Sequence, residues 1–509
     1  MLSIIKSYAL EGINGYPIDI EVDTQAGVGS FDIVGLPSSA VKESRNRVRS
    51  AIKNSCYEFV PKRVTVNMAP ADIKKEGSLY DFPIALGFLA STEQIETSRL
   101  SDYVIVGELS LDGSLRRVNG IMPILISALQ EGYKKFIIPY ENAKEASFIA
   151  GIEVYAIKNL SDACAFLGGF KAVHPVIHDV YHSSSVNNKY GVDLMDVKGQ
   201  VVAKRALEIA VAGGHNILMC GTPGAGKTLL AKCVPTIMPD MTFEEAIETT
   251  KIHSIAGLID EKEGMITVRP FRSPHHTASL HSLTGGGTKS RPGEVSLAHN
   301  GVLFLDEMPE YDKKTLETLR QPLEDGVITI SRVARSIEYP ARFMLVASMN
   351  PCPCGNYGSE INECTCTANE IKKYRSRISG PLLDRIDIFV EVDSVEYSEL
   401  RGDNDDAEPS SLVKERVERA RRRQLARFKY DGIYTNAEMN NSMISKYCEL
   451  DEQSEKLLQL AFNRYRLSAR GTMRIIKIAR TIADLRNSPD IQISDLAEAI
   501  QYRTKEFDE

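Results

Sequence analysis

The chain has 509 residues, of which 43% are hydrophobic and 25% charged, with a formal net charge of −7. This balance is typical of a folded protein of roughly three domains, and it excludes a disordered chain, a collagen and a small disulfide scaffold. No run reaches the roughly 18 consecutive apolar residues that span a bilayer, and the first residues lack the pattern of a signal peptide. We therefore expect a cytoplasmic protein with no membrane partner, whose nucleic-acid contacts come from local basic patches.

Residues 1–170 alternate between strand-like and helix-like patterns. Residues 18–22 and 63–67 alternate polar and apolar side chains, as half-buried strands do, and residues 136–139 form a short apolar strand. Residues 39–53 indicate an amphipathic helix with Arg45, Arg47 and Arg49 on its solvent face. These patterns predict a first domain that contains both strands and helices.

The rest of the chain divides into three further segments. Residues 171–190 are rich in His, Ser and Asn, lose all periodicity and indicate a polar linker. Residues 192–393 alternate strands and helices, as parallel α/β sheets do, and residues from about 410 to 503 are helical almost throughout. We place the corresponding domains at residues 191–395 and 396–509. The predicted fold class is thus α/β, with an α+β first domain, a central α/β domain and a C-terminal helical domain. We interpret the arginine-rich helix expected near residues 414–429 as a solvated face or a subunit contact.

One segment fits the phosphate-binding motif G-x-x-x-x-G-K-[ST] at every fixed position, between an apolar strand and a helix-forming run. Its residues are Gly221, Thr222, Pro223, Gly224, Ala225, Gly226, Lys227 and Thr228. Glycines let backbone N–H groups curl around phosphate oxygens at the start of a helix. We expect the lysine to contact the β- and γ-phosphates of ATP and the threonine to bind Mg²⁺.

A second motif ends a buried strand in two carboxylates, Asp306 and Glu307. Buried carboxylates are costly unless they serve a cation or hydrogen bonds. We expect Asp306 to hold Mg²⁺ and Glu307 to polarise the attacking water. The alternative is a strand that simply runs into a polar loop.

Two more polar residues stand beside predicted strands. Asn350 ends the apolar run 343–349, where it either aligns the water and senses the γ-phosphate or merely starts a turn before Pro351. Arg385 precedes the strand 388–392. It is either a surface ion pair with Asp384 or Asp387, or an arginine finger for a neighbouring subunit.

Four of the nine cysteines, Cys352, Cys354, Cys364 and Cys366, form two Cys-x-Cys pairs in one loop. Four thiolates suit tetrahedral Zn²⁺, although the usual pair is C-x₂-C. A reduced, partly exposed loop and a redox disulfide are the alternatives. The other five cysteines are scattered and are expected to fill core positions.

The assembled motifs resemble the ComM/YifB family of magnesium chelatase-like AAA+ ATPases. The matching strings begin at Asp196, Ala203, Phe271, Arg291, Met349 and Ile378, and the resemblance covers essentially the whole chain. It implies a hexameric ring with ATP at subunit interfaces, Asn350 as sensor 1 and Arg385 as the finger. It also implies that Arg474, in the Gly-x-x-Arg string from Gly471, is the sensor 2 of a helical lid; Arg470 is its rival, and a plain helix-surface arginine is the other alternative.

Two basic segments are candidates for DNA contact. Residues 326–339 indicate a β-hairpin with Arg332 and Arg335 near its tip, and such hairpins point into the ring's pore in related proteins. The loop with Lys289 and Arg291 is a second candidate. Both would meet DNA phosphates independently of sequence, and a solvated basic turn is the alternative in each case.

Residues 1–170 resemble the proteolytic (S5-type) domain of Lon proteases around Gly107–Gly113 and Ile138–Lys144. A Ser–Lys dyad needs a lysine beside the serine. Ser78 stands in the corresponding serine region, but the stretch that corresponds to the Lon lysine, residues 120–124, holds no lysine. We interpret this domain as an inactive relative that serves as a platform for the ring or a partner.

The resemblance implies a homohexameric, ATP- and Mg²⁺-dependent motor that acts on single-stranded and branched DNA. Its expected role is that of a helicase promoting branch migration during recombination and natural transformation. The alternatives are a chelatase-like motor that inserts Mg²⁺ into a porphyrin and a Lon-like ATP-dependent protease. An acidic linker followed by an integrin-like metal domain would favour the chelatase, and the helical C-terminal segment does not resemble one.

Overall fold

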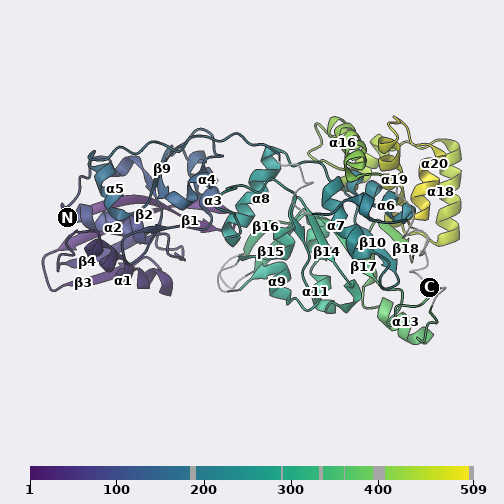
Figure 1. The fold of residues 1–509 in the computed structure, drawn as a ribbon, viewed down its shortest axis with the longest axis horizontal. Helices are drawn as coiled ribbons and strands as arrows, with labels where there is room; N and C mark the ends of the chain where they lie inside the picture. The colour runs from purple at the N-terminus through teal and green to yellow at the C-terminus, as the bar shows by residue number, and fades with distance from the viewer. Residues whose placement is uncertain (184–190, 288–290, 332–335, 360–361, 394–406, 504–509) are drawn as a thin grey trace.

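The computed structural model of the chain describes residues 1–183, 191–287, 291–331, 336–359, 362–393 and 407–503. An N-terminal sheet, a central sheet and a group of C-terminal helices follow one another along the long axis of the molecule (Figure 1). This arrangement confirms the predicted α/β class with its mixed first domain and helical C-terminal part. Among the helices within those ranges, none is long and apolar enough to cross a membrane.

Seven strands form the N-terminal sheet. In spatial order they are β3 (Ser30–Val34), β4 (Arg63–Ala69), β2 (Asn14–Gln25), β1 (Leu2–Glu11), β5 (Val104–Ile105), β8 (Lys135–Pro139) and β9 (Glu153–Ile157). β2 pairs antiparallel with both β1 and β4, and the other neighbours run parallel. The strands predicted at residues 18–22, 63–67 and 136–139 are confirmed, because each lies inside one of these elements.

Five helices and a small hairpin complete this part of the chain. The elements are α1 (Ser39–Asn54), α2 (Asp81–Ser91), α3 (Ile121–Gln130), α4 (Ala143–Ala146), α5 (Leu160–Leu167), β6 (Glu108–Leu109) and β7 (Leu115–Arg116). Every residue of α2 is buried, since the helix packs directly on β1 and β2. One hydrophobic core therefore lies between α2 and the long β1–β2 hairpin, and a second core gathers around α3, β5 and β8.

The helix predicted at residues 39–53 is confirmed as α1, but the placement of Arg47 on its solvent face is wrong. Arg47 donates to the carboxylate of Asp81 from Nε at 2.6 Å and from Nη2 at 3.0 Å. Asp81 is fully buried at the start of α2, and burial raises its pKa. A buried carboxylate needs such a partner, and the two residues are too far apart in sequence for periodicity to pair them.

Residues 171–183 contain no helix or strand, as expected of the predicted linker. They nevertheless form hydrogen bonds both with the N-terminal sheet and with the central part of the chain. The Val176 amide donates to the Val154 carbonyl at 2.8 Å, and the Tyr181 hydroxyl donates to the Met241 carbonyl at 2.9 Å. This segment thus connects the N-terminal sheet to the central part through specific contacts. The last predicted linker residues, 184–190, lie outside the described ranges.

The central sheet is parallel and has five strands. In spatial order they are β11 (Phe271–Arg272), β14 (Val302–Leu305), β17 (Met344–Met349), β10 (Ile217–Gly221) and β18 (Ile388–Val392). β14 and β17 are buried along their whole length, as expected of strands covered on both faces. Helices and short strands surround the sheet: α6 (Val201–Gly213), α7 (Lys227–Ile237), α8 (Phe243–Ala256), α9 (Leu280–Thr284), α10 (Glu294–Leu297), α11 (Lys313–Glu317), α12 (Arg320–Asp325), α13 (Ala368–Arg375), α14 (Gly380–Leu383), β12 (Gly285–Gly286) and β13 (Arg291–Pro292).

The predicted β-hairpin near residues 326–339 is confirmed by β15 (Val327–Ser331) and β16 (Ser336–Pro340), which pair antiparallel. Its base is anchored, because Ile328 and Tyr339 are buried. Ile337 lies so close to Gly12, in the β1–β2 turn, that a methyl group on that glycine would approach its Cγ2 to 2.7 Å. The N-terminal sheet therefore touches the hairpin directly.

The C-terminal part consists of α16 (Ser410–Arg427), α17 (Asn441–Tyr447), α18 (Glu452–Tyr465), α19 (Ala469–Leu485) and α20 (Ile493–Gln501). α16 packs on α6, α7 and α19, and its arginines are largely engaged within the chain. Arg421 donates to the Val211 carbonyl at 3.0 Å, and Arg427 donates to buried Asp484 at 2.9 Å. The interpretation of this helix as a solvated or subunit-contacting basic face is therefore wrong for these residues.

Candidate functional site

The predicted phosphate loop joins the end of β10 to the start of α7, at the carboxyl edge of the central sheet. Gly224 and Gly226 have φ angles of +82° and +88°. Glycine adopts this left-handed region without a steric penalty, whereas side chains oppose it. The loop therefore has the conformation with which backbone N–H groups surround a phosphate at a helix N-terminus.

Lys227 is buried at the first position of α7, and burial lowers its pKa. Its Nζ donates to the carbonyl oxygens of Gly221 and Thr222 at 2.6 and 2.9 Å, and to Oδ1 of Asn350 at 3.2 Å. The ammonium group is thus held within the loop by neutral oxygens. Phosphate oxygens would be stronger acceptors for the same donors.

The two predicted magnesium ligands are in direct contact. Thr228 Oγ1 donates to Oδ2 of Asp306 at 3.0 Å, across the gap between the start of α7 and the end of β14. A hydroxyl and a carboxylate at this spacing offer the hard oxygen ligands that Mg²⁺ prefers, with room for water and nucleotide oxygens. The structure therefore brings together two residues that are 78 positions apart in the sequence.

Glu307 follows Asp306 and has a φ of +50°. Non-glycine residues in this region are strained and are often found at active sites. The Glu307 amide donates to Oγ of Ser348 at 3.0 Å, and Ser348 in turn donates to Oδ1 of Asp306. One serine thus holds both the backbone of the predicted catalytic carboxylate and the side chain of the predicted metal ligand.

Sequence reasoning missed Ser348. It lies in β17, which pairs with β14 so that Ala347 faces Leu305, the residue before Asp306. Its signal in the sequence is a single hydroxyl in an otherwise apolar, buried strand. That signal becomes informative only when the order of the strands is known, because the partners of Ser348 come from a neighbouring strand.

Asn350 follows β17 and so lies at the same carboxyl edge as the phosphate loop. Besides accepting from Lys227, it directs its backbone amide to the hydroxyl of Tyr374, whose pKa is raised by burial to about 12. The structure therefore places Asn350 against the lysine of the phosphate loop, whichever role the residue has in the turn before Pro351.

Arg385 lies at the opposite edge of the sheet. It precedes β18, which runs parallel to β10, so it is at the amino edge while the phosphate loop is at the carboxyl edge. Strands of this length put about 16 Å of sheet between the two edges. Arg385 forms an ion pair with Glu324 of α12 and donates to the Pro381 carbonyl at 2.7 Å. The proposed pairing with Asp384 or Asp387 is wrong, because the acidic partner is Glu324.

Arg474 is also at the amino edge. Its Nε lies 3.0 Å from Oδ1 of Asp387, just before β18. Burial alone would raise the pKa of Asp387, but the hydrogen bond to His215 and the charge of Arg474 lower it well below its usual range. Arg474 is therefore not a free helix-surface arginine: it joins α19 to the segment that carries Arg385.

The four clustered cysteines converge. Their sulfur atoms all lie within 4.8 Å of one another, and all four are free thiols. Backbone N–H groups of Asn356 and Thr365 lower the pKa of the Cys354 thiol to about 6. A cluster of this number and spacing can bind a metal ion.

The predicted DNA contacts are only partly described. Arg291 is exposed in β13, which pairs with β12. Lys289, Arg332 and Arg335 lie outside the described residues.

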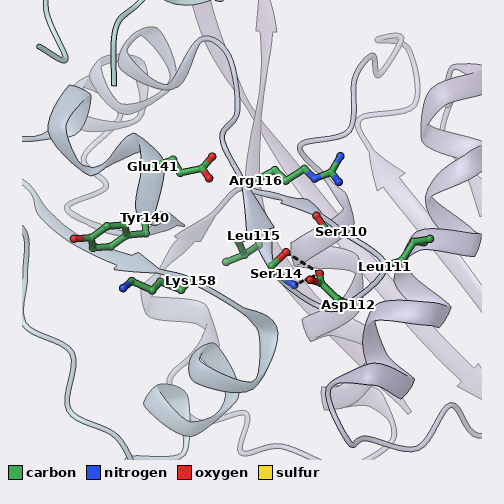
Figure 2. A pocket seen from close by; sticks show the side chains of 9 residues that line it. All are labelled: Ser110, Leu111, Asp112, Ser114, Leu115, Arg116, Tyr140, Glu141 and Lys158. Carbon is green, nitrogen blue, oxygen red and sulfur yellow. Dashed lines mark hydrogen bonds between the residues drawn. The ribbon is translucent and has the colours of Figure 1, made fainter. Parts of the chain in front are cut away.

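A cavity of about 660 Å³ lies in the N-terminal part (Figure 2), and none of its lining residues belongs to the nucleotide motifs. Asp112, Arg116, Glu141 and Lys158 are among its polar lining residues, and Ser78 is not. Ser78 donates instead to Glu108. The nearby Lys75 is buried and donates to the Pro70 carbonyl, so among the hydrogen bonds of the described residues none forms the Ser–Lys pair of a protease.

Comparisons with known proteins agree with this geometry. Residues 193–400 match the family model described as magnesium chelatase, subunit ChlI; residues 20–142 match subunit ChlI of Mg-chelatase, and residues 407–503 match the ChlI C-terminal model. The chain is 43% identical to competence protein ComM of Haemophilus influenzae over 506 residues, which cover 99% of this chain and 97% of the relative. It is also 43% identical to YifB of Escherichia coli, with the same shares covered.

A more distant similarity extends to the Lon fold. Lon protease 2 of Bacillus subtilis is 29% identical over 178 residues, about 32% of each chain. This similarity and the ChlI match in residues 20–142 support the ChlI/Lon-like character of the N-terminal sheet. By its near full-length identity and its three family matches, the chain belongs to the ComM/YifB family of magnesium chelatase ChlI-like AAA+ ATPases.

Proposed function

We propose that this chain is a hexameric, ATP-hydrolysing DNA motor, a helicase that drives branch migration during recombination and natural transformation. The observation that carries the proposal is the division of its charged residues between two edges of one sheet. Lys227 lies in the phosphate loop and Thr228 contacts Asp306, all at the carboxyl edge, whereas Arg385 lies at the amino edge. A finger on the opposite edge can reach a γ-phosphate only in a neighbouring subunit, which favours a closed ring.

The catalytic roles follow from the contacts. Lys227 would exchange its carbonyl partners for the β- and γ-phosphates of ATP, and Thr228 and Asp306 would hold Mg²⁺. Glu307 would polarise the attacking water from a backbone fixed by Ser348. Asn350, already bonded to Lys227, would report on the γ-phosphate. Arg474 would act beside Arg385, because Asp387 ties it to the same edge.

The DNA would be single-stranded or branched and would contact the ring through phosphates. Arg332 and Arg335, between β15 and β16, and Lys289 and Arg291, just before and at the start of β13, would supply the positive charge for this sequence-independent contact. The relative named as a competence protein supports a role in natural transformation. Residues 1–170, without a serine–lysine pair, would serve as a platform for the ring or a partner, followed by the linker 171–190, the ATPase core 191–395 and the lid 396–509. Nine free cysteines fit the reducing cytoplasm.

The proposal is tested by measuring ATP turnover of the purified protein alone and with single-stranded, duplex, forked and four-way junction DNA. We expect forked or four-way DNA to raise turnover, and labelled junctions to be resolved by branch migration when ATP is present. The Lys227→Ala protein is the matched control and should bind the same junctions without moving them. If the protein hydrolyses ATP at a rate that no DNA substrate changes, and branch migration of the junctions is not observed, the proposal is overturned.

A magnesium chelatase-like motor is the second candidate, since the matching family models carry that name. It predicts turnover that is insensitive to DNA and magnesium insertion into a porphyrin in the presence of partner subunits. The same turnover measurements therefore separate the two candidates.

A further inference from the structure

The segment between Asn350 and α13 gathers four thiols at one point. Cys352, Cys354, Cys364 and Cys366 come from two Cys-x-Cys pairs separated by nine residues. The sulfur of Cys352 lies 3.3 Å from that of Cys354 and 3.7 Å from that of Cys364, and the latter two lie 3.6 Å apart. Two pairs separated by nine residues need not lie close together in space. Their convergence therefore indicates that the four sulfur atoms serve a common function.

These distances fit one ion with four sulfur ligands. A Zn–S bond of about 2.3 Å in a tetrahedron places neighbouring sulfurs about 3.8 Å apart. A disulfide would need about 2.05 Å and would join only two of the four. Soft thiolate ligands select zinc over magnesium and calcium. The amide of Tyr357 donates to the Cys352 sulfur at 3.3 Å, as outer-shell groups around metal thiolates do.

We propose that the four cysteines bind one Zn²⁺ ion and that the resulting metal-bound loop positions the phosphate loop of the ATP site. The inference does not depend on DNA motor activity, because zinc content and ATP turnover are measured without DNA.

The link to the phosphate loop is a backbone contact. Gly355, directly after Cys354, has a φ of +83°, and a methyl group on it would lie 2.6 Å from the ring carbons of Pro223. The cysteine loop is therefore pressed against the loop that receives the phosphates. Cys352 is completely buried, and its carbonyl accepts a hydrogen bond from the Gly355 amide at 3.0 Å. A metal ion bound to Cys352 and Cys354 would therefore fix the position of Gly355 against Pro223.

The far end of the same segment reaches the turn that follows the two predicted carboxylates. The Tyr374 hydroxyl, on α13, receives the backbone amide of Asn350. Two residues after α13, Arg377 pairs with Glu310 at 2.8 Å, three residues beyond Glu307. The cysteine loop and α13 thus make contacts with Asn350, with Pro223 and with Glu310, three residues after Glu307. Ordering this span by a metal would pre-organise all three parts of the site.

The first experiment measures metal content in protein purified under reducing conditions without chelator. We expect about one zinc ion per chain by elemental mass spectrometry. Cys56→Ser, which removes an exposed thiol elsewhere, should keep the metal, and Cys364→Ser/Cys366→Ser should lose it. Parent protein with less than about 0.1 zinc per chain that also takes up none from a stoichiometric zinc solution would overturn the proposal. So would mass-spectrometric mapping of disulfides among these four residues in the purified protein.

The second experiment tests the link to the phosphate loop with zinc in place. Gly355→Ala should retain zinc but lose ATP turnover roughly 10- to 100-fold, the size of effect that a displacement of about 1 Å produces. Gly358→Ala is the matched control: its φ is +76° in the same loop, but no described atom lies within 4 Å of the added methyl group. Equal turnover in the two zinc-loaded variants would show that the metal loop does not position the phosphate loop.

Discussion

Ser348 illustrates how a single side chain organises this site. Its hydroxyl accepts from the Glu307 amide and donates to Asp306, so it links the expected metal ligand to the residue expected to activate water. The backbone of Glu307 is in the left-handed region, a conformation that costs about 1–3 kcal/mol in a non-glycine residue. The hydrogen bond from its amide offsets part of that cost and fixes the direction in which the carboxylate leaves the sheet.

The first prediction concerns Glu307→Gln. The amide side chain retains the size of the carboxylate but cannot accept a proton from water, so ATP should bind normally while turnover falls by about 10²- to 10⁴-fold. Fluorescent nucleotide binding and phosphate release, measured on the same preparation, check both parts. Lys227→Ala is the comparison, because it removes the phosphate-binding charge and should weaken binding itself. Normal phosphate release in the Glu307→Gln protein would show that another group activates the water.

At the scale of elements, the sequence predicted the structure correctly wherever the pattern lay within one contiguous segment. The phosphate loop and the strands around it are contiguous motifs, and the helix 39–54 and the β15–β16 hairpin follow from periodicity. Contacts between elements were not accessible, because they depend on the order of strands. The bond of Ser348 to Asp306 and the pairing of Arg385 with Glu324 both require the sheet topology. The inward-facing arginines of α16 show the same limit, since composition cannot tell a solvated charge from a bonded one.

The β15–β16 hairpin carries the second prediction. Its base is fixed by buried Ile328 and Tyr339 and by the contact of Ile337 with the β1–β2 turn. Arg332→Ala/Arg335→Ala should therefore leave the fold and the basal ATPase unchanged while DNA stimulation is lost, because neither arginine belongs to a nucleotide motif. Each lost phosphate contact should reduce the slope of log affinity against log salt by roughly 0.7–0.9.

Titrating junction DNA at several salt concentrations provides the measurement. Arg45→Ala, which removes an exposed arginine of α1 in the N-terminal part, is a control for the general loss of positive charge. Identical salt slopes for the hairpin variant and the parent protein would exclude the hairpin from the DNA path.

At the scale of the whole molecule, the two edges of the central sheet carry different sets of the predicted site residues. The carboxyl edge holds the phosphate loop, Asp306 and Asn350, and the amino edge holds Arg385 and Arg474. In a single chain these sets are separated by the length of the strands and cannot meet around one nucleotide. In the proposed head-to-tail ring, the amino edge of one subunit would meet the carboxyl edge of the next, through the heterologous contact that closed cyclic assemblies use.

The third prediction tests this division by mixing subunits. Arg385→Ala and Lys227→Ala proteins should each be inactive, but a mixture should recover activity, because some interfaces join an intact phosphate loop to an intact Arg385. Random assembly at equal amounts makes about a quarter of the interfaces complete. Mixing either variant with the Lys227→Ala/Arg385→Ala double variant is the control and should recover nothing, since no complete interface can form. Native mass spectrometry confirms that mixed rings are present.

Glu324→Gln should remain active, since Glu324 pairs with Arg385 in the isolated subunit but has no role at the neighbour's nucleotide. If mixed rings form without recovery, and Glu324→Gln is as inactive as Arg385→Ala, then the arginine serves its own subunit as an ion pair.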